Sequence, residues 1–334
     1  MSHTPSRRTA VAVFGAGAWG TVLASLLAEA GSEVTLWARR PEHAAVLAAQ
    51  RQNPDYLPDF PLPAGVRPTA DLAAAADAEL AVVAVPSRAV RALARALPTR
   101  AHSSVPLVLA AKGIEADRFL RLSQVVEEER PGTPVAVLSG PNLAAEIAAG
   151  KPAAATVAST DAVLAQRTQA LLVDSPLRVY TSTDVVGVEI AGALKNVIAL
   201  ASGMCDGLGL GDNSKAAIIT RGLAEIVRLG MHLGGDPRTF YGLAGLGDLV
   251  ATCASAQSRN HLAGVRFAHG ATLAQIEASH LTAEGIPTAL AVHRKMLEMG
   301  LEMPISSEVY RVVYEGKAVE DALRALMERE AKAE

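Results

Sequence analysis

The stretch AVAVFGAGAWG, residues 10–20, decides the fold of this chain. Its first five residues are apolar, which predicts a buried strand, and a helix is expected to begin near Thr21. Between them, Gly15 permits a tight turn, Gly17 lets the backbone approach a ligand, and Gly20 allows close packing of the helix on the strand. The unpaired N–H groups at the start of such a helix bind phosphates. A glycine-rich turn can be purely structural, but the strand before it and the helix after it favour a dinucleotide site.

Short β-branched runs alternate with alanine-rich helical runs over the first half of the chain. Strands are expected at Ala10–Phe14, Glu33–Trp37, Leu80–Val85, Leu107–Ala111, Val135–Leu138, Ala155–Ala158 and Leu177–Tyr180. Helices are expected at Thr21–Ala30, Glu42–Gln50, Ala89–Leu97, Asp117–Glu129 and Ala162–Leu172. This alternation is typical of a mostly parallel sheet covered by helices, so the fold class is α/β with a Rossmann-type domain. Residues Asn53–Pro68 hold five prolines and are expected to form an irregular excursion that arches over the sheet.

The sequence pattern changes from about Val185, where strand signals nearly vanish. Helices are expected at Val185–Met204, Lys215–Leu233, Leu246–Ala254, Arg259–Ala268, Leu273–Ser279, Ala289–Met299, Ser307–Tyr314 and Ala318–Glu328. We therefore expect a dinucleotide-binding Rossmann domain over residues 1–183 and an all-helical substrate and catalytic domain over residues 184–334.

Composition and charge argue against several classes of protein. Across 334 residues, 31 Lys+Arg against 34 Asp+Glu leave a net charge of −3, and the sequence has no basic run of the kind that binds nucleic acid. Two scattered cysteines predict no disulfide framework and no zinc site, and they favour the reducing cytoplasm. Eight scattered histidines show no metal-ligand spacing. Residues Met1 to Thr9 are not followed by the apolar run of a secretory signal, so the sequence predicts no such signal here. The most apolar window, residues 185–204, contains Glu189 and Lys195, which favours a buried helix over a membrane span.

Two arginines follow the second predicted strand, at the position that contacts the adenosine ribose in Rossmann domains. An NAD site usually places Asp or Glu there, whereas an arginine accommodates a 2′-phosphate. Arg39 and Arg40 stand there without a carboxylate. The sequence therefore predicts NADP(H) as the preferred cofactor, with NAD(H) possible.

Lys195 is the first candidate for catalysis because it lies in the middle of an apolar helix. Desolvation there lowers the pKa of a lysine toward the range of a general acid or base. The alternative is an exposed lysine on an amphipathic helix. Its neighbour Asn196 could hydrogen-bond a ligand.

A glycine-rich run at residues 242–249 carries the second catalytic candidate, Asp248, and Thr252 follows one turn later on the same helix face. We expect Asp248 to pair with Lys195 and tune it. The alternative is that Asp248 only caps its helix.

Three further motifs carry polar residues suited to a substrate. Ser258 is expected to cap a helix whose first turn holds Arg259 and Asn260, and such a group of amides, hydroxyl and guanidinium suits a phosphomonoester. Lys112 follows a predicted parallel strand, and the SGPN run at residues 139–142 ends the next one. The carboxyl ends of such strands face the ligand crevice of open α/β sheets.

Taken together, these residues resemble the soluble NAD(P)-dependent sn-glycerol-3-phosphate dehydrogenases of bacteria. The motifs that carry the resemblance are the glycine run at 15–20, LW at 36–37, AKG at 111–113, LSGP at 138–141, KNVIA at 195–199, the run at 242–249, QSRN at 257–260 and MPI at 303–305. The resemblance implies reversible reduction of dihydroxyacetone phosphate to sn-glycerol 3-phosphate, the glycerol backbone of phospholipids.

The resemblance also implies roles for individual residues, with Lys195 as the proton acceptor. Around the substrate it implies Lys112, Gly140, Asn142, Asp248, Ser258, Arg259 and Asn260. Along the cofactor it implies Ala18, Trp19, Arg39, Arg40, Lys112, Ala144, Arg259, Thr282 and Glu284. The sequence differs from the residues that are usual in the family at Ala18-Trp19, Asn142-Leu143 and Thr282-Ala283.

Two alternatives share this layout. One is a reductase of a hydroxy acid or ketopantoate-like acid, which has less need of the phosphate-binding group at Ser258-Arg259-Asn260. The other is a non-catalytic NADP(H) sensor, which does not need a buried Lys–Asp pair. The apolar, alanine-rich helices of the second half also favour a homodimer.

Overall fold

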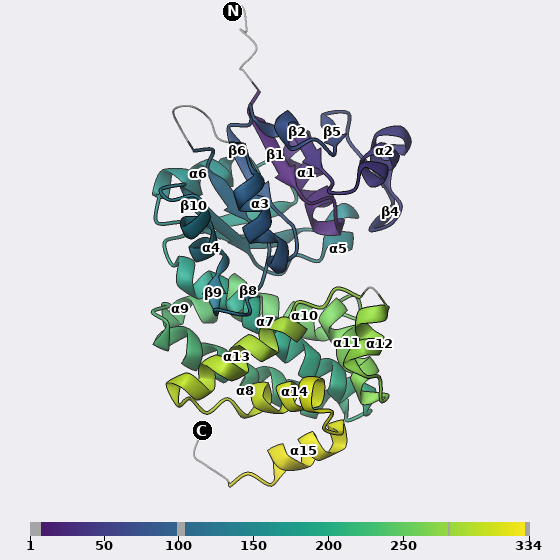
Figure 1. The fold of residues 1–334 in the computed structure, drawn as a ribbon, viewed down its shortest axis with the longest axis vertical. Coiled ribbons are helices and arrows are strands. Elements are labelled where there is room, and N and C mark those ends of the chain that lie inside the picture. The colour runs from purple at the N-terminus through teal and green to yellow at the C-terminus, as the bar shows by residue number, and fades with distance from the viewer. Residues whose placement is uncertain (1–7, 99–103, 280, 331–334) are drawn as a thin grey trace, which may run out of the picture. The chain divides into compact units, whose positions relative to one another are not determined.

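The computed structural model describes residues 8–98, 104–279 and 281–330, and the chain divides into two compact units (Figure 1). The first unit comprises the chain up to Ala111 together with Leu122–Val185, and the second comprises Lys112–Arg121 together with the chain from Val186. The sequence-based division at residue 183 left the segment Lys112–Arg121 with the first domain, whereas this segment belongs to the helical unit.

That segment is not helical, although the sequence predicted a helix over Asp117–Glu129. It forms a hairpin of two short strands, β8 (Ile114–Glu115) and β9 (Leu120–Arg121). Phe119 has a φ angle of 53°, in the left-handed region that a right-handed helix does not contain. The helix therefore begins only at Leu122. Ile114 is buried in the hydrophobic core of the second unit, which explains why the hairpin joins it.

An eight-stranded sheet organises the first unit (Figure 1). Its strands are β1 (Ala10–Phe14), β2 (Glu33–Trp37), β5 (Val66–Thr69), β6 (Leu80–Val83), β7 (Leu107–Leu109), β10 (Val135–Ser139), β11 (Ala153–Ala158) and β12 (Leu177–Ser182). Their order is β12-β11-β10-β7-β6-β1-β2-β5, and neighbours are parallel except β10 and β11. This confirms the predicted, mostly parallel Rossmann-type sheet.

The proline-rich residues Asn53–Pro68 are more regular than the sequence predicted. Strand β3 (Gln52–Asn53) and strand β4 (Leu57–Pro61) form an antiparallel hairpin, and β5 joins the main sheet as its edge strand. Pro68 lies opposite Leu36 of β2. An edge strand tolerates proline because its outer N–H has no strand to bond.

Six α-helices accompany the sheet within the described residues of the first unit. They are α1 (Ala18–Glu29), α2 (Pro41–Gln50), α3 (Val90–Ala96), α4 (Leu122–Glu129), α5 (Ala144–Ala148) and α6 (Ala162–Ala170). Helices α1 and α5 pack together, as do α3 and α4. The core is aliphatic, with Leu23, Leu36 and Leu138 almost completely buried. Burial of such side chains stabilises the fold by about 1.5–3 kcal/mol each.

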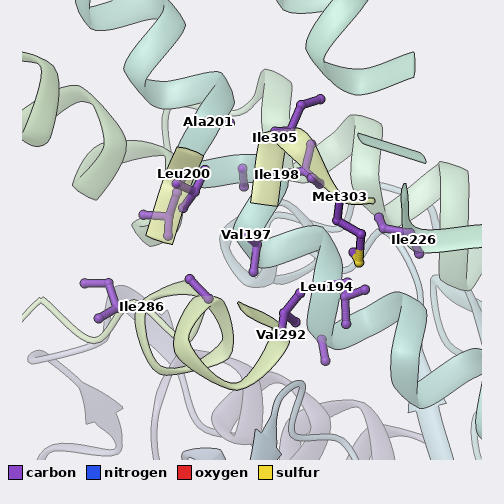
Figure 2. Close-up of a cluster of buried hydrophobic side chains, with 14 of the residues drawn as sticks. Leu194, Val197, Ile198, Leu200, Ala201, Ile226, Ile286, Val292, Met303 and Ile305 are labelled. Atoms are coloured by element: carbon purple, nitrogen blue, oxygen red, sulfur yellow. The ribbon is translucent and has the colours of Figure 1, made fainter. Parts of the chain in front are cut away.

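The described part of the second unit is helical apart from its β hairpin. Its α-helices are α7 (Val185–Gly207), α8 (Gly211–His232), α9 (Pro237–Phe240), α10 (Asp248–Ala254), α11 (Arg259–Ala268), α12 (Leu273–Ala278), α13 (Gly285–Met299), α14 (Pro304–Glu315) and α15 (Val319–Met327). Helix α7 is the centre of the core, and its residues from Gly187 to Cys205 are all buried. Figure 2 shows Leu194 and Val197 of α7 within a cluster that includes Ile226 of α8.

Helix α7 is long and apolar enough to cross a membrane by length and composition alone. However, 89% of its most apolar 18-residue window is buried inside the protein. Such burial is that of a core helix, as the polar residues within it predicted.

Candidate active site

The glycine-rich turn after β1 has the backbone geometry that its sequence predicted. Gly15 has a φ angle of +114°, and Gly20 approaches it so closely that a Cβ at Gly20 would lie 1.8 Å from the Gly15 carbonyl oxygen. Any side chain at either position would therefore be strained or would collide with the turn. A Cβ at Gly17 would meet no protein atom within 4 Å. The open space at Gly17 is the room that a pyrophosphate group needs.

Two side chains that sequence reasoning missed hold this turn by the carbonyl oxygen of Ala16. Asn53 Nδ2 donates to it at 3.0 Å and His43 Nε2 lies 3.2 Å from it. Asn53 Nδ2 also donates to Thr21 Oγ1 at 2.7 Å. These contacts link β3 and α2 to the turn, and no periodic pattern in the sequence signals them.

The start of α1 fits the phosphates of a dinucleotide. Gly17 precedes the helix, no side chain caps it, and its first turn contains no acidic residue. The first backbone N–H groups and the positive end of the helix dipole therefore remain available to an anion. Trp19 adds a buried Nε1 without a hydrogen-bond partner among the described residues.

Arg39 and Arg40, predicted to contact the adenosine ribose, are both exposed after β2. Arg40 Nη2 donates to Asp55 Oδ2 at 3.2 Å, and both side chains are 55% exposed. Guanidinium groups in this position fit a 2′-phosphate, although Asp55 already engages one of them.

Lys195 and Asp248 lie in direct contact in the second unit, as the sequence predicted. Lys195 Nζ donates to Asp248 Oδ1 and also to Thr252 Oγ1, the latter at 2.7 Å. Lys112 Nζ donates to the other carboxylate oxygen, Asp248 Oδ2, at 2.7 Å. The Lys195 and Asp248 side chains are only 7% and 2% exposed. Two lysine amino groups thus share one buried carboxylate.

Burial lowers the pKa of Lys195 to about 7. The negative charge of Asp248 acts in the opposite direction, and the positive charge of Lys112 reinforces the decrease. A lysine with this pKa changes protonation state near neutral pH, as a general acid or base must.

Local structure explains how Asp248 comes to face Lys195. A π-helical turn, Leu243–Gly247, precedes α10, and Asp248 is the first residue of that helix. Gly247 is the N-cap, and no side-chain capping bond is present. The alternative in which Asp248 only caps its helix is therefore wrong.

The hairpin β8–β9 brings Lys112 into this cluster. An ion pair between Arg121 and Glu189, at 2.7 Å, joins the end of the hairpin to α7. Glu189 is only 5% exposed in its side chain. Because Lys112 begins the same segment, this anchor helps to fix its position beside Asp248.

The turn that begins α11 has the predicted cap. Ser258 is its N-cap, and Ser258 Oγ accepts a hydrogen bond from His261 N at 3.3 Å. Arg259 is exposed in the first turn. Helix α11 approaches α7 closely, since a Cβ at Gly264 would lie 2.1 Å from the Leu200 carbonyl oxygen.

Asn260 and Asn196, both predicted to bind substrate, are bonded to each other. Asn260 Nδ2 donates to Asn196 Oδ1 at 2.9 Å, and Asn260 Oδ1 accepts from Gly285 N at 2.8 Å. Asn260 therefore ties α11 to α7 and α13. The adjoining His261 Nε2 lies 2.7 Å from Asp206 Oδ2, a contact that the sequence did not predict.

The remaining predicted site residues fall into both units. Gly140 and Asn142 lie between the end of β10 and the start of α5 in the first unit, and Ala144 is the first residue of α5. Thr282 and Glu284 lie just before α13 in the second unit, where Glu284 is the residue that precedes the helix.

A Rossmann-type unit with an open phosphate-binding turn, together with a helical unit holding a buried Lys–Asp pair, defines the class of two-unit, nicotinamide-dependent oxidoreductases. The sequence profile of the NAD-dependent glycerol-3-phosphate dehydrogenase N-terminus matches residues 10–165, and that of the C-terminus matches residues 184–324. The chain therefore belongs to the NAD-dependent glycerol-3-phosphate dehydrogenase family. This confirms the resemblance drawn from the motifs.

Individual relatives are similar to this chain over nearly its whole length. A glycerol-3-phosphate dehydrogenase (NAD(P)+) of Streptomyces coelicolor is 50% identical over 334 residues, covering 98% of this chain and 99% of that protein. One of Moorella thermoacetica is 49% identical over 324 residues, covering 96% of each. The crystal structure of glycerol-3-phosphate dehydrogenase from Coxiella burnetii is 35% identical with a TM-score of 0.91, covering 96% of this chain and 99% of that chain.

Proposed function

We propose that the chain catalyses the reversible, NAD(P)-dependent reduction of dihydroxyacetone phosphate to sn-glycerol 3-phosphate. The observation that carries this proposal is the buried contact between Lys195 and Asp248, in a chain that belongs to this family. The product is the glycerol backbone from which phospholipids are made.

The glycine-rich turn and the start of α1 would hold the cofactor pyrophosphate, and Arg39 and Arg40 would meet a 2′-phosphate. The cofactor, when bound, supplies the hydride that reduces the carbonyl carbon. Ala144, Thr282 and Glu284 are further proposed contacts along it. This donor set supports a preference for NADP(H) with NAD(H) also used.

Lys195 would act on the oxygen of the substrate carbonyl at C2. Negative charge grows on this oxygen during reduction, and the cationic Lys195 Nζ stabilises the charge and donates its proton. In the oxidative direction, neutral Lys195 accepts the proton from the hydroxyl group. Asp248 holds the ammonium of Lys195 in place and favours its charged form, and Thr252 orients it. The positive charge of Lys112 opposes this effect of Asp248 on Lys195.

The start of α11 would bind the phosphate of the substrate. Exposed Arg259 offers a bidentate guanidinium beside the N-terminal amides of that helix, and Ser258 fixes the turn. Binding energy from this remote group positions the reacting carbon. Gly140 and Asn142 are proposed to line the same substrate, and the bonded pair Asn196–Asn260 holds the phosphate-binding turn against α7.

The direct test is to follow oxidation of NADPH by the purified chain with dihydroxyacetone phosphate and, separately, with ketopantoate. We expect kcat/KM for dihydroxyacetone phosphate to be at least about 10²-fold higher, because Arg259 is left without its phosphate in the other case. Repeating the assay with NADH should give a slower reaction. A preference for ketopantoate would contradict the proposal.

We further propose that the enzyme is a cytoplasmic homodimer. The cysteines Cys205 and Cys253 are both free and buried, which suits a reducing compartment. The alanine-rich apolar helices of the second unit support the dimer, which light scattering of the purified chain would test.

A further inference from the structure

The carboxylate of Asp55 stands beside two groups at the start of α2. Asp55 Oδ2 accepts from Arg40 Nη2 at 3.2 Å and lies 3.4 Å from His43 Nδ1. Arg40 is the residue immediately before the first turn of α2, and His43 lies within that turn. Asp55 therefore meets the guanidinium that follows β2, although it is distant from it in sequence.

His43, which lies beside Asp55, is held by its own contacts. The His43 side chain is 7% exposed, and Tyr56 packs edge-on against its ring with centroids 5.5 Å apart. Because the Ala16 carbonyl oxygen can only accept, His43 Nε2 must donate to it. The nitrogen that faces Asp55 is then the other ring nitrogen, Nδ1. The His43 ring thus lies between Asp55 and the phosphate-binding turn.

A carboxylate and a phosphate compete for the same guanidinium donors, and their negative charges repel each other. A phosphate on the ribose 2′-oxygen that approaches Arg40 must displace Asp55 or accept its repulsion. A ribose 2′-hydroxyl is neutral, so it need not displace Asp55 and is not repelled by its charge.

We propose that Asp55 moderates the cofactor selectivity of this enzyme by competing with the 2′-phosphate for Arg40. The inference rests on the proposed function and deepens it, since it assigns the balance between NADP(H) and NAD(H) to one carboxylate. Asp55 lowers the affinity for the 2′-phosphorylated cofactor and so reduces the difference in affinity between NADP(H) and NAD(H).

Binding of cofactor fragments tests this without catalysis. Calorimetry at low ionic strength would give the dissociation constants of adenosine 2′,5′-bisphosphate and of adenosine 5′-monophosphate. We expect Asp55→Asn to tighten the bisphosphate about two- to fivefold, the range for releasing a half-exposed ion pair, and to leave the monophosphate unchanged. The gain should shrink as salt is added.

Two variants separate competition at Arg40 from other effects. Asp174→Asn removes the same charge from an exposed aspartate of the first unit and should change neither affinity. In an Arg40→Ala background, Asp55→Asn should lose most of its gain. Thermal unfolding of each variant checks that the fold is retained, and a tighter-binding variant cannot be explained by damage to the fold.

The contrary outcomes are distinct. If wild type binds both fragments but Asp55→Asn leaves their affinity ratio unchanged, the inference is overturned and the proposed function stands. An undiminished gain in the Arg40→Ala background, or weaker binding of the monophosphate in Asp55→Asn, would also overturn competition at Arg40. If wild type binds neither fragment, the dinucleotide site itself is wrong and the inference falls with it.

Discussion

Replacement of Lys195 by alanine is expected to lower the turnover of dihydroxyacetone phosphate reduction about 10²–10⁴-fold, the usual contribution of one proton-transfer group. The loss should appear in kcat, because the proton moves only in the transition state. Binding of NADPH should be unaffected, since Lys195 is not among the residues proposed to contact the cofactor. Steady-state kinetics and a fluorescence titration with NADPH measure the two quantities.

The variant should remain folded because Asp248 keeps a cationic partner. Lys112 still donates to Asp248 Oδ2 after Lys195 is removed, so the buried carboxylate is not left alone. Lys151→Ala, at an exposed lysine of the first unit, is the matched control and should behave as wild type. Added small primary amines should partly restore the activity of Lys195→Ala. Near-normal turnover of Lys195→Ala would refute the assignment.

Replacement of Arg259 by alanine should raise the KM for dihydroxyacetone phosphate roughly 10²-fold, because a charge-assisted bidentate contact to the phosphate is lost. Dihydroxyacetone without its phosphate should be reduced slowly by wild type and equally slowly by Arg259→Ala. Steady-state kinetics with both substrates therefore isolates the contribution of the phosphate contact.

Arg266→Ala is the matched control, since Arg266 lies in the last turn of the same helix and donates to Ser279 Oγ. It should leave the KM unchanged. Arg259→Lys should recover only part of the loss, because lysine keeps the charge but not the planar fork. An unchanged KM in Arg259→Ala would show that the phosphate binds elsewhere.

Much of the fold followed from local patterns. Strands β1 and β2 and helix α11 have the predicted bounds, because apolar runs, a glycine-rich turn and a serine cap are signals contained in a few neighbouring residues. The pair Lys195–Asp248 also followed, since a lysine and an aspartate in apolar or glycine-rich surroundings need a partner when buried.

Other features depend on contacts between residues far apart in the chain, which periodicity does not encode. The hairpin β8–β9 has strands of two residues, too short to show any period, yet it places Lys112 beside Asp248. His43 and Asn53 likewise contact the Ala16 carbonyl oxygen through single polar groups that are far from it in sequence. Sequence reasoning therefore anticipated the contact between Lys195 and Asp248, but it did not find the contacts that position Lys112 and the glycine-rich turn.

The pH dependence of kcat/KM in both directions tests most directly whether Lys195 moves the proton. Because burial lowers the pKa of Lys195 to about 7, kcat/KM for reduction should fall as pH rises through about 7, where the ammonium is lost. For oxidation of sn-glycerol 3-phosphate, kcat/KM should rise through the same midpoint. In Lys195→Ala, both of these changes near pH 7 should be absent, and only the ionisation of the substrate phosphate, at pH ~6, should remain. A midpoint near that of a solvated lysine, about 10, or limbs that persist in Lys195→Ala would contradict the account.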